Sequence, residues 1–205
     1  MKPNVRFLAA YALATLICVL PAHSYFVIFK EEFYRLYHIH YQQYPEDVIE
    51  NIYWLEKAAK ADFCNPQFAL AKIENEDDWE KYRYLFMMHI NLKLIEQHLR
   101  LGRTWDKTVA RFYDAPWKDE YLSGLEKAEN CYRAGLVYWE EAKKWGEKAN
   151  TGRFRFLFLT DIQNWEDERE RISSGKLNYE KMLNRELERI GKVRGEFMAM
   201  DKQTY

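Results

Sequence analysis

Histidines are the first residues whose spacing could support chemistry, because a close pair can hold a metal ion. His38 and His40 form such a pair. If 25–43 is a helix, residues two apart point about 200° apart around its axis, so the two rings cannot share an ion. His89 and His98 also fall on different sides of a helix. We therefore expect structural histidines and no metal site.

Paired carboxylates could act as the general acid and base of a hydrolase that cleaves cell-wall glycans. The acids that lie together just before Trp79 are Glu74, Glu76, Asp77 and Asp78. The same acids would also suit the first turn of a helix, where they interact favourably with free backbone N–H groups. We favour the helix start and keep the hydrolase as the alternative function. The mixed charges of 166–171 have helical spacing and predict a solvated helix face.

Nucleophilic residues are few in this chain. Beyond residue 24 the serines are Ser123, Ser173 and Ser174, and none lies in a Gly-x-Ser-x-Gly turn. Cys64 and Cys131 have no histidine beside them in the sequence, and whether they form a disulfide is left open. Glycine-rich phosphate-binding loops are absent. We therefore expect no catalytic residue and no cofactor, as in a protein that is not an enzyme.

The composition indicates a globular protein with one domain. The chain has 205 residues, of which 48% are hydrophobic and 31% are charged, which is enough to bury a core. Its 31 basic and 32 acidic residues give no net positive charge, so nucleic acid is not an expected partner. The composition also excludes a disordered tail, a collagen-like rod and a multi-pass membrane protein.

Residues 1–24 have the layout of a secretory signal peptide. A short basic start precedes an uncharged stretch from Phe7 to Leu20, which Pro21 ends. Small residues then lead to a cleavage point before Tyr25. The alternative is a retained membrane anchor, because the uncharged stretch could run on to Phe29 and span a bilayer. In both cases we expect export, to the bacterial periplasm, with membrane contact only if the segment is retained.

Two long segments have the clearest helical pattern. In 76–101 one apolar stripe and a second, neighbouring apolar row predict a helix that is packed between neighbours. In 117–149 small residues recur every seventh position and form a shallow groove that a second helix can approach closely. We expect another helix of the same chain to fill this groove. Its residues are Ala128, Gly135, Ala142 and Ala149.

The other segments complete an all-α prediction. Apolar residues recur every three or four positions in 25–43, 45–62 and 176–200, which predicts helices there. Glycines such as Gly102 are expected to mark the joins between helices. The start of 153–173 could be a strand or a helix, because its aromatic residues alternate as they would in a strand. A lone strand would leave its backbone groups unpaired. We therefore predict a helix there as well. Residues 25–205 should form a single domain of about six or seven antiparallel helices with short joins.

Two stretches resemble parts of a tetratricopeptide repeat. Residues 46–50, followed by Tyr53, Ala58 and the pair 65–66, are similar to a second helix and its exit turn. The stretch 131–138 is similar to a first helix, with small residues between large ones. The period of about 34 residues that defines the family is not kept across the chain. The architecture expected is therefore a degenerate tetratricopeptide-like array or an irregular helical bundle.

A second, narrower resemblance concerns function. The stretch 79–89 (WEKYRYLFMMH), together with 99–102 (LRLG), resembles the periplasmic collar proteins of spirochaete flagellar motors. Those proteins are repeat-type scaffolds that hold stator units around the motor and have no catalytic activity. The resemblance implies a scaffold whose partners are other proteins, namely collar or stator components.

Aromatic residues are the main compositional excess, with 15 Tyr, 12 Phe and 7 Trp. A core of this size cannot easily hide them all, and Tyr and Trp are favoured at protein interfaces. We expect a protein-binding surface of aromatic anchors with arginines at its edge. The alternative is packing of 104–113 against 117–149 within a hairpin. The candidate binding residues are Arg103, Trp105, Arg111, Tyr113, Trp117 and Tyr121.

Overall fold

A computed structural model describes residues 26–109, 117–157 and 163–200 of the chain. This part of the chain is all-helical, without a β-sheet, which confirms the predicted fold class. It contains a short 3₁₀ turn, η1 (Pro66–Phe68), and the α-helices α2 (Lys30–Gln43), α3 (Val48–Lys60), α4 (Glu76–Val109), α5 (Lys118–Ala149), α6 (Gln163–Ser173) and α7 (Tyr179–Ala199).

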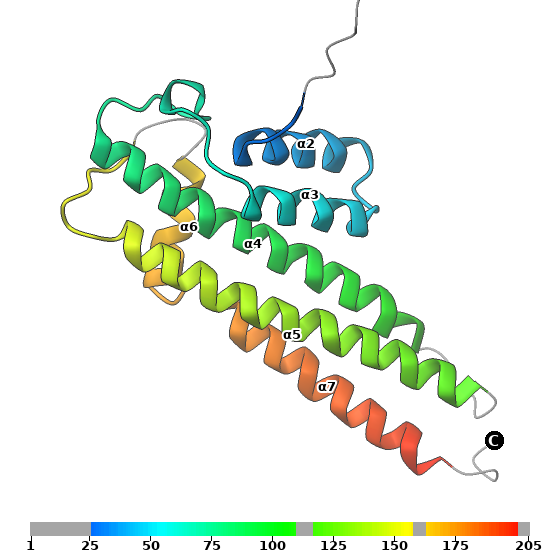
Figure 1. Cartoon of the computed structure of the whole chain (residues 1–205). Coiled ribbons are helices and arrows are strands. Elements are labelled where there is room, and N and C mark those ends of the chain that lie inside the picture. Colours follow the sequence, from blue (N-terminus) through cyan, green and yellow to red (C-terminus); the bar gives the residue numbers. More distant parts are fainter. Residues whose placement is uncertain (1–25, 110–116, 158–162, 201–205) are drawn as a thin grey trace, which may run out of the picture.

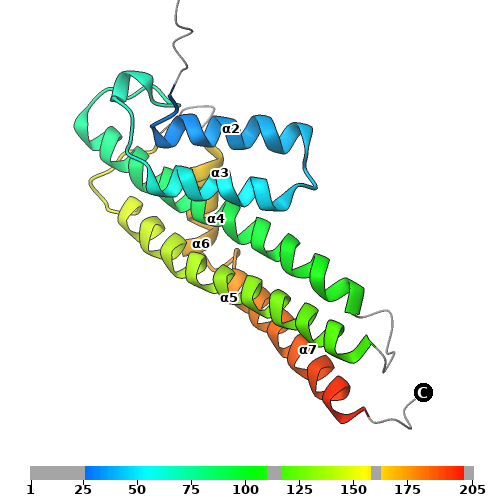
Figure 2. The same ribbon diagram turned by 45° about the vertical axis from the view of Figure 1, so that its right-hand side comes forward.

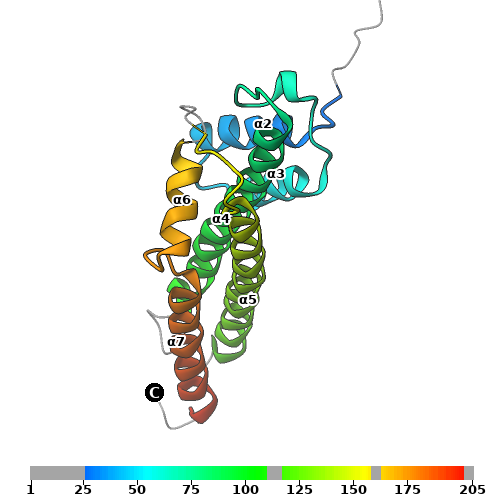
Figure 3. The ribbon, with the colours of Figure 1, turned by 90° about the vertical axis from the view of Figure 1, so that its left-hand side faces the viewer.

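The helices are arranged around one long antiparallel hairpin, formed by α4 and α5 (Figure 1). Helices α2 and α3 form a shorter hairpin beside α4 (Figure 2), and α7 runs along α5 on the other side. Helix α6 packs against the first half of α4 and the last turns of α5 (Figure 3). The helices differ widely in length, from 11 residues in α6 to 34 in α4. None of the helices described here is both long and apolar enough to cross a bilayer.

The acids before Trp79 lie at a helix start, as predicted. Helix α4 begins at Glu76, and the side chain of Asn75 accepts a hydrogen bond from the backbone N–H of Asp78 at 2.8 Å. Asp47 and Asn178 cap α3 and α7 in the same way. Such caps satisfy backbone donors that have no partner inside the helix.

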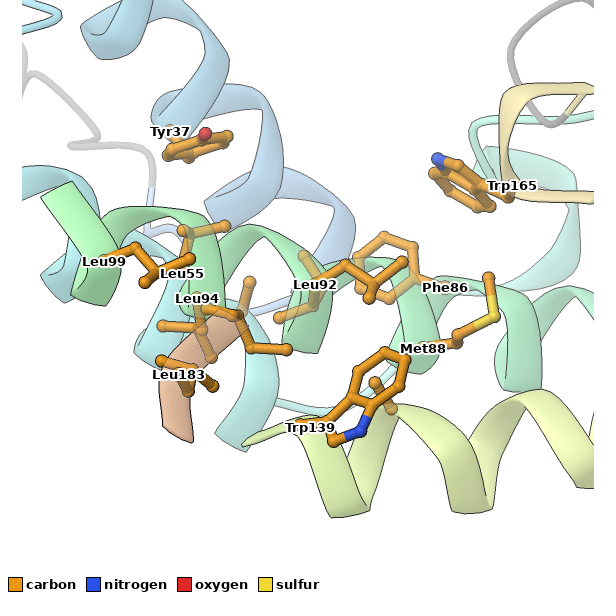
Figure 4. Close-up of a cluster of buried hydrophobic side chains, with 14 of the residues drawn as sticks. Tyr37, Leu55, Phe86, Met88, Leu92, Leu94, Leu99, Trp139, Trp165 and Leu183 are labelled. Atoms are coloured by element: carbon orange, nitrogen blue, oxygen red, sulfur yellow. The ribbon is translucent and has the colours of Figure 1, made fainter. Parts of the chain in front are cut away.

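The core surrounds α4. Both of its predicted apolar rows are buried, with no side chain more than 4% exposed. One row consists of Leu85, Met88, Leu92, Ile95 and Leu99, and the other of Tyr82, Phe86, Ile90 and Leu94. Figure 4 shows side chains from the other five helices converging on α4. These are Tyr37 of α2, Leu55 of α3, Trp139 of α5, Trp165 of α6 and Leu183 of α7. The prediction that this segment is packed between neighbours is therefore confirmed.

The small-residue groove of α5 is filled from within the chain, as predicted. All of its members are buried, and α7 packs against the helix. At Gly135 an added Cβ would lie 2.9 Å from Cδ2 of Leu183. A larger residue would therefore push α7 away from α5.

Two predictions of local structure were wrong. Gly102 lies inside α4 and not at a join. Its role is close packing, because an added Cβ would lie 2.5 Å from Cε1 of the Tyr132 ring. Residues 153–157 are not helical; their backbone is held by side chains of other elements. Lys81 donates to the Arg155 carbonyl, and Glu166 accepts from the Leu157 N–H.

We predict that Gly102→Ala destabilises the protein relative to Gly191→Ala. Both positions are helical, so both substitutions gain about 1 kcal/mol of helix propensity. An added Cβ at Gly191 meets no atom within 4 Å, whereas at Gly102 it collides with Tyr132. Urea unfolding should show that Gly102→Ala is less stable than Gly191→Ala by about 1–3 kcal/mol. Equal stability of the two variants would contradict the close packing at Gly102.

Candidate functional site

The predicted binding surface lies at the end of the α4–α5 hairpin, where α4 ends and α5 begins (Figure 1). Trp105 is 37% exposed and Trp117 is 54% exposed. The ammonium group of Lys127 lies 4.4 Å from the centroid of the Trp105 ring, which is a cation–π contact. Both tryptophans therefore present aromatic surface to solvent at the same end of the molecule.

The other candidate binding residues are placed differently. Arg103 contacts Glu186 of α7, with Nη2 3.4 Å from Oε1. The Tyr121 ring packs on Phe197 of α7, with 5.5 Å between centroids. These two residues belong to the contact between the hairpin and α7. Arg111 and Tyr113 lie outside the described residues.

The carboxylates considered for hydrolysis are held in ion pairs. Asp78 is 2% exposed and accepts a hydrogen bond from Arg155 Nε at 2.8 Å. The same guanidinium donates to Glu74 at 3.0 Å. Arg155 therefore holds the pKa values of Asp78 and Glu74 below their usual range. A glycosidase acid needs the opposite, a raised pKa, so this geometry does not favour the hydrolase.

A pocket that the sequence did not reveal lies between α2, α4 and α6. Its volume is about 670 Å³, in the range of small-molecule sites. Figure 3 shows the three helices at the same end of the molecule. Its lining residues are far apart in the sequence, so no local motif could have indicated it. They are Tyr34, Arg35, His38, Ile39 and Gln42 of α2, Leu70 from the segment between η1 and α4, His89 and Lys93 of α4, and Asn164, Trp165 and Glu168 of α6.

A hydrogen-bonded chain fixes one wall of this pocket. The Tyr34 hydroxyl lies 2.7 Å from His89 Nε2, and Nδ1 of the same ring lies 2.6 Å from Glu168 Oε2. Burial, reinforced by the charge of Glu168, raises the pKa of Tyr34, so the phenol stays protonated and can donate to Nε2 of a neutral imidazole. Nδ1 then carries the proton and donates to Glu168. The Trp165 ring stacks on the imidazole at 5.0 Å.

Both ring nitrogens of His89 are therefore bonded within the protein. His40 is bonded similarly, with Nδ1 3.1 Å from Asn51 Oδ1. Within the described ranges, no three potential ligands lie close enough to share a metal ion.

The prediction of a solvated face at 166–171 was wrong for Glu166 and Glu168. Glu166 is fully buried and forms ion pairs with Lys81, which is 5% exposed, and with Arg169. The sequence could not show this pairing, because Lys81 comes from α4, far away in the chain. Removal of one partner from a buried ion pair of this kind strongly destabilises a protein, because the other charge is left buried without a partner.

Cys64 and Cys131 are both free thiols, which answers the question that the sequence left open. Burial, reinforced by the neighbouring Glu31, raises the pKa of the Cys64 thiol to about 12. Such a thiol is almost entirely protonated at neutral pH and is a poor nucleophile. Burial also raises the pKa of Cys131.

Comparison with known proteins gives one family. Residues 77–200, more than half of the chain, match the family model described as "Domain of unknown function (DUF8513)". The chain therefore belongs to this family. The matched region runs from α4 to α7 and includes two walls of the pocket and the hairpin end. No curated protein and no solved structure matches the chain.

We predict a pH-dependent stability that depends on His98. Neither of its ring nitrogens has a hydrogen-bond partner in the described structure, and the ring stacks on Tyr138 at 5.3 Å between centroids. Burial lowers its pKa, although the charge of Glu56 opposes the shift. Because the folded pKa lies below the unfolded value of about 6.5, the unfolded state binds the proton more readily. The stability that neutral His98 contributes to the folded state is therefore intact above about pH 6.5 and is lost as the pH falls below that value.

The matched variant is His98→Phe, which keeps a ring for stacking on Tyr138 and removes the titrating group. Urea unfolding at decreasing pH should show a steeper loss of stability in the original protein than in His98→Phe. The difference should approach about 1.4 kcal/mol per pH unit below pH 6.5. Parallel stability curves for the two proteins would rule out His98 as the source.

Proposed function

We propose that this family member is an exported, non-enzymatic scaffold that binds other proteins through the hairpin end, the surface around Trp105 and Trp117. One observation carries the proposal: the side chains of two tryptophans are exposed at the same end of a long helical hairpin. Tryptophan is enriched among the residues that dominate protein–protein binding energies, and its exposure on a free surface leaves apolar area for a partner to cover.

A groove near the start of α5 suits a basic partner. It has a volume of about 610 Å³ and lies between α5 and α7. Its lining includes Asp119 and Glu126, which form no ion pair within the described structure, and the exposed Met198. A partner segment with an apolar anchor and Lys or Arg beside it would complement this surface in both polarity and charge.

The site of action is proposed from the sequence. The signal-peptide pattern of residues 1–24 supports export to the periplasm. The resemblance of 79–89 to collar proteins of spirochaete flagellar motors supports a role as a structural component of such a collar, with collar or stator proteins as partners. Retention of the N-terminal segment would make the same scaffold membrane-anchored.

A scaffold is favoured over a hydrolase by the electrostatics of the acids. Glu74 and Asp78 share the guanidinium of Arg155, which lowers the pKa of both carboxyls. They are therefore suited to an ion pair that fixes the start of α4 and not to proton donation.

We predict that the hairpin end crosslinks to a protein partner in intact cells. A photo-crosslinking amino acid in place of Glu120, an exposed residue beside Trp117, should yield a defined heterocomplex on irradiation. The double substitution Trp105→Ala and Trp117→Ala should reduce its yield at least tenfold, since loss of an aromatic anchor typically costs 2 kcal/mol or more, about a factor of thirty.

The matched control is Phe68→Ala, which removes a 70% exposed aromatic ring from η1, outside the hairpin end. It should leave the crosslink yield unchanged. The proposal fails if the double variant remains folded by circular dichroism and still crosslinks normally, or if Phe68→Ala reduces the yield equally.

A further inference from the structure

We propose that the pocket between α2, α4 and α6 is a binding site for a small organic anion with an apolar body. This site is separate from the hairpin end and does not rest on the proposed scaffold function. Its volume of about 670 Å³ is suited to a ligand of ordinary metabolite or drug size. The proposal follows from the charges, the apolar surface and the rigidity of the lining.

The pocket lining carries two cationic side chains, Arg35 and Lys93, and one carboxylate, Glu168. Arg35 lies at its edge with an exposed side chain and has no ion-pair or hydrogen-bond partner within the described residues. Lys93 is bonded to Glu96 of its own helix, in a half-exposed pair that contributes little by itself. Glu168 is the one carboxylate in the described lining, and it accepts a hydrogen bond from Nδ1 of His89. A carboxylate or similar anion is therefore the charge that this pocket complements.

The remaining lining provides apolar contact and neutral polar groups. Ile39 and Leu70 offer aliphatic surface, and Gln42 and Asn164 offer amides that can orient a bound ligand. The imidazole of His38 also faces the pocket. Burial, together with the charge of Lys93, lowers its pKa, so at neutral pH it can accept or donate a hydrogen bond without adding a fixed charge.

The inner wall is rigid before any ligand binds. Tyr34 and Trp165 are at most 6% exposed, and the chain from Tyr34 through His89 to Glu168 connects all three helices. Trp165 also packs edge-on against Tyr34 and Phe86. A preformed wall lowers the entropic cost of binding, because few side chains have to be ordered.

The test uses 4-phenylbutyrate as the anionic probe and 4-phenylbutan-1-ol as its uncharged counterpart. Isothermal titration calorimetry on the full chain should show one site for the acid and binding at least roughly tenfold weaker for the alcohol. Arg35→Gln, which removes the charge and keeps a polar side chain, should weaken binding of the acid roughly tenfold. Arg185→Gln removes another exposed arginine, on α7, and should leave the affinity unchanged.

Three results would overturn the proposal. The first is the absence of saturable binding of 4-phenylbutyrate at millimolar concentrations. The second is equal affinity for the acid and the alcohol, which would show an apolar site without anion recognition. The third is an equal loss of affinity in Arg35→Gln and Arg185→Gln, which would show that the acid binds through nonspecific attraction to surface charge. Lys93→Gln provides a second variant, and its affinity should fall in the same direction as that of Arg35→Gln.

Discussion

Burial of α4 on both of its apolar faces is the constraint on which the rest of the structure depends. Its two apolar rows are at most 4% exposed, and each large side chain contributes roughly 1.5–3 kcal/mol when it leaves water. A single neighbouring helix cannot cover two faces, so the other five helices all supply side chains to them (Figure 4). The close approach of α5, which Gly102 permits at the Tyr132 ring, completes this packing.

The same constraint explains the polar interior. Lys81 and His89 lie on α4 among apolar residues and are removed from water when α6 covers them. Each needs a partner, and α6 provides Glu166 for the lysine and Glu168 for the histidine. The pocket lies where α6 and α2 meet above α4. Beyond α6, the hairpin continues to its end, where fewer neighbours leave the tryptophans exposed.

Local patterns in the sequence predicted much of the fold. The apolar rows of 76–101 and the small residues of 117–149 report on burial directly, so the packing of both helices was predicted correctly. The acid-rich start of α4 was also predicted correctly, because acids in a first turn interact favourably with free backbone N–H groups. Gly102 was misread because a glycine that ends a helix and one that admits a neighbouring ring look alike in a sequence. Glu166 and Glu168 were misread because their partners belong to α4, and for the same reason no pattern within α2, α4 or α6 indicated the pocket.

Native-state hydrogen exchange measures the central claim most directly, because amides in a fully enclosed helix exchange only when the whole structure opens. We predict that residues 82–99 of α4 are the slowest-exchanging segment, with an opening free energy equal to the global stability. Residues 103–107, near the exposed Trp105, should exchange faster. Exchange of 82–99 as fast as that of α2, or well before global unfolding, would contradict the central position of α4.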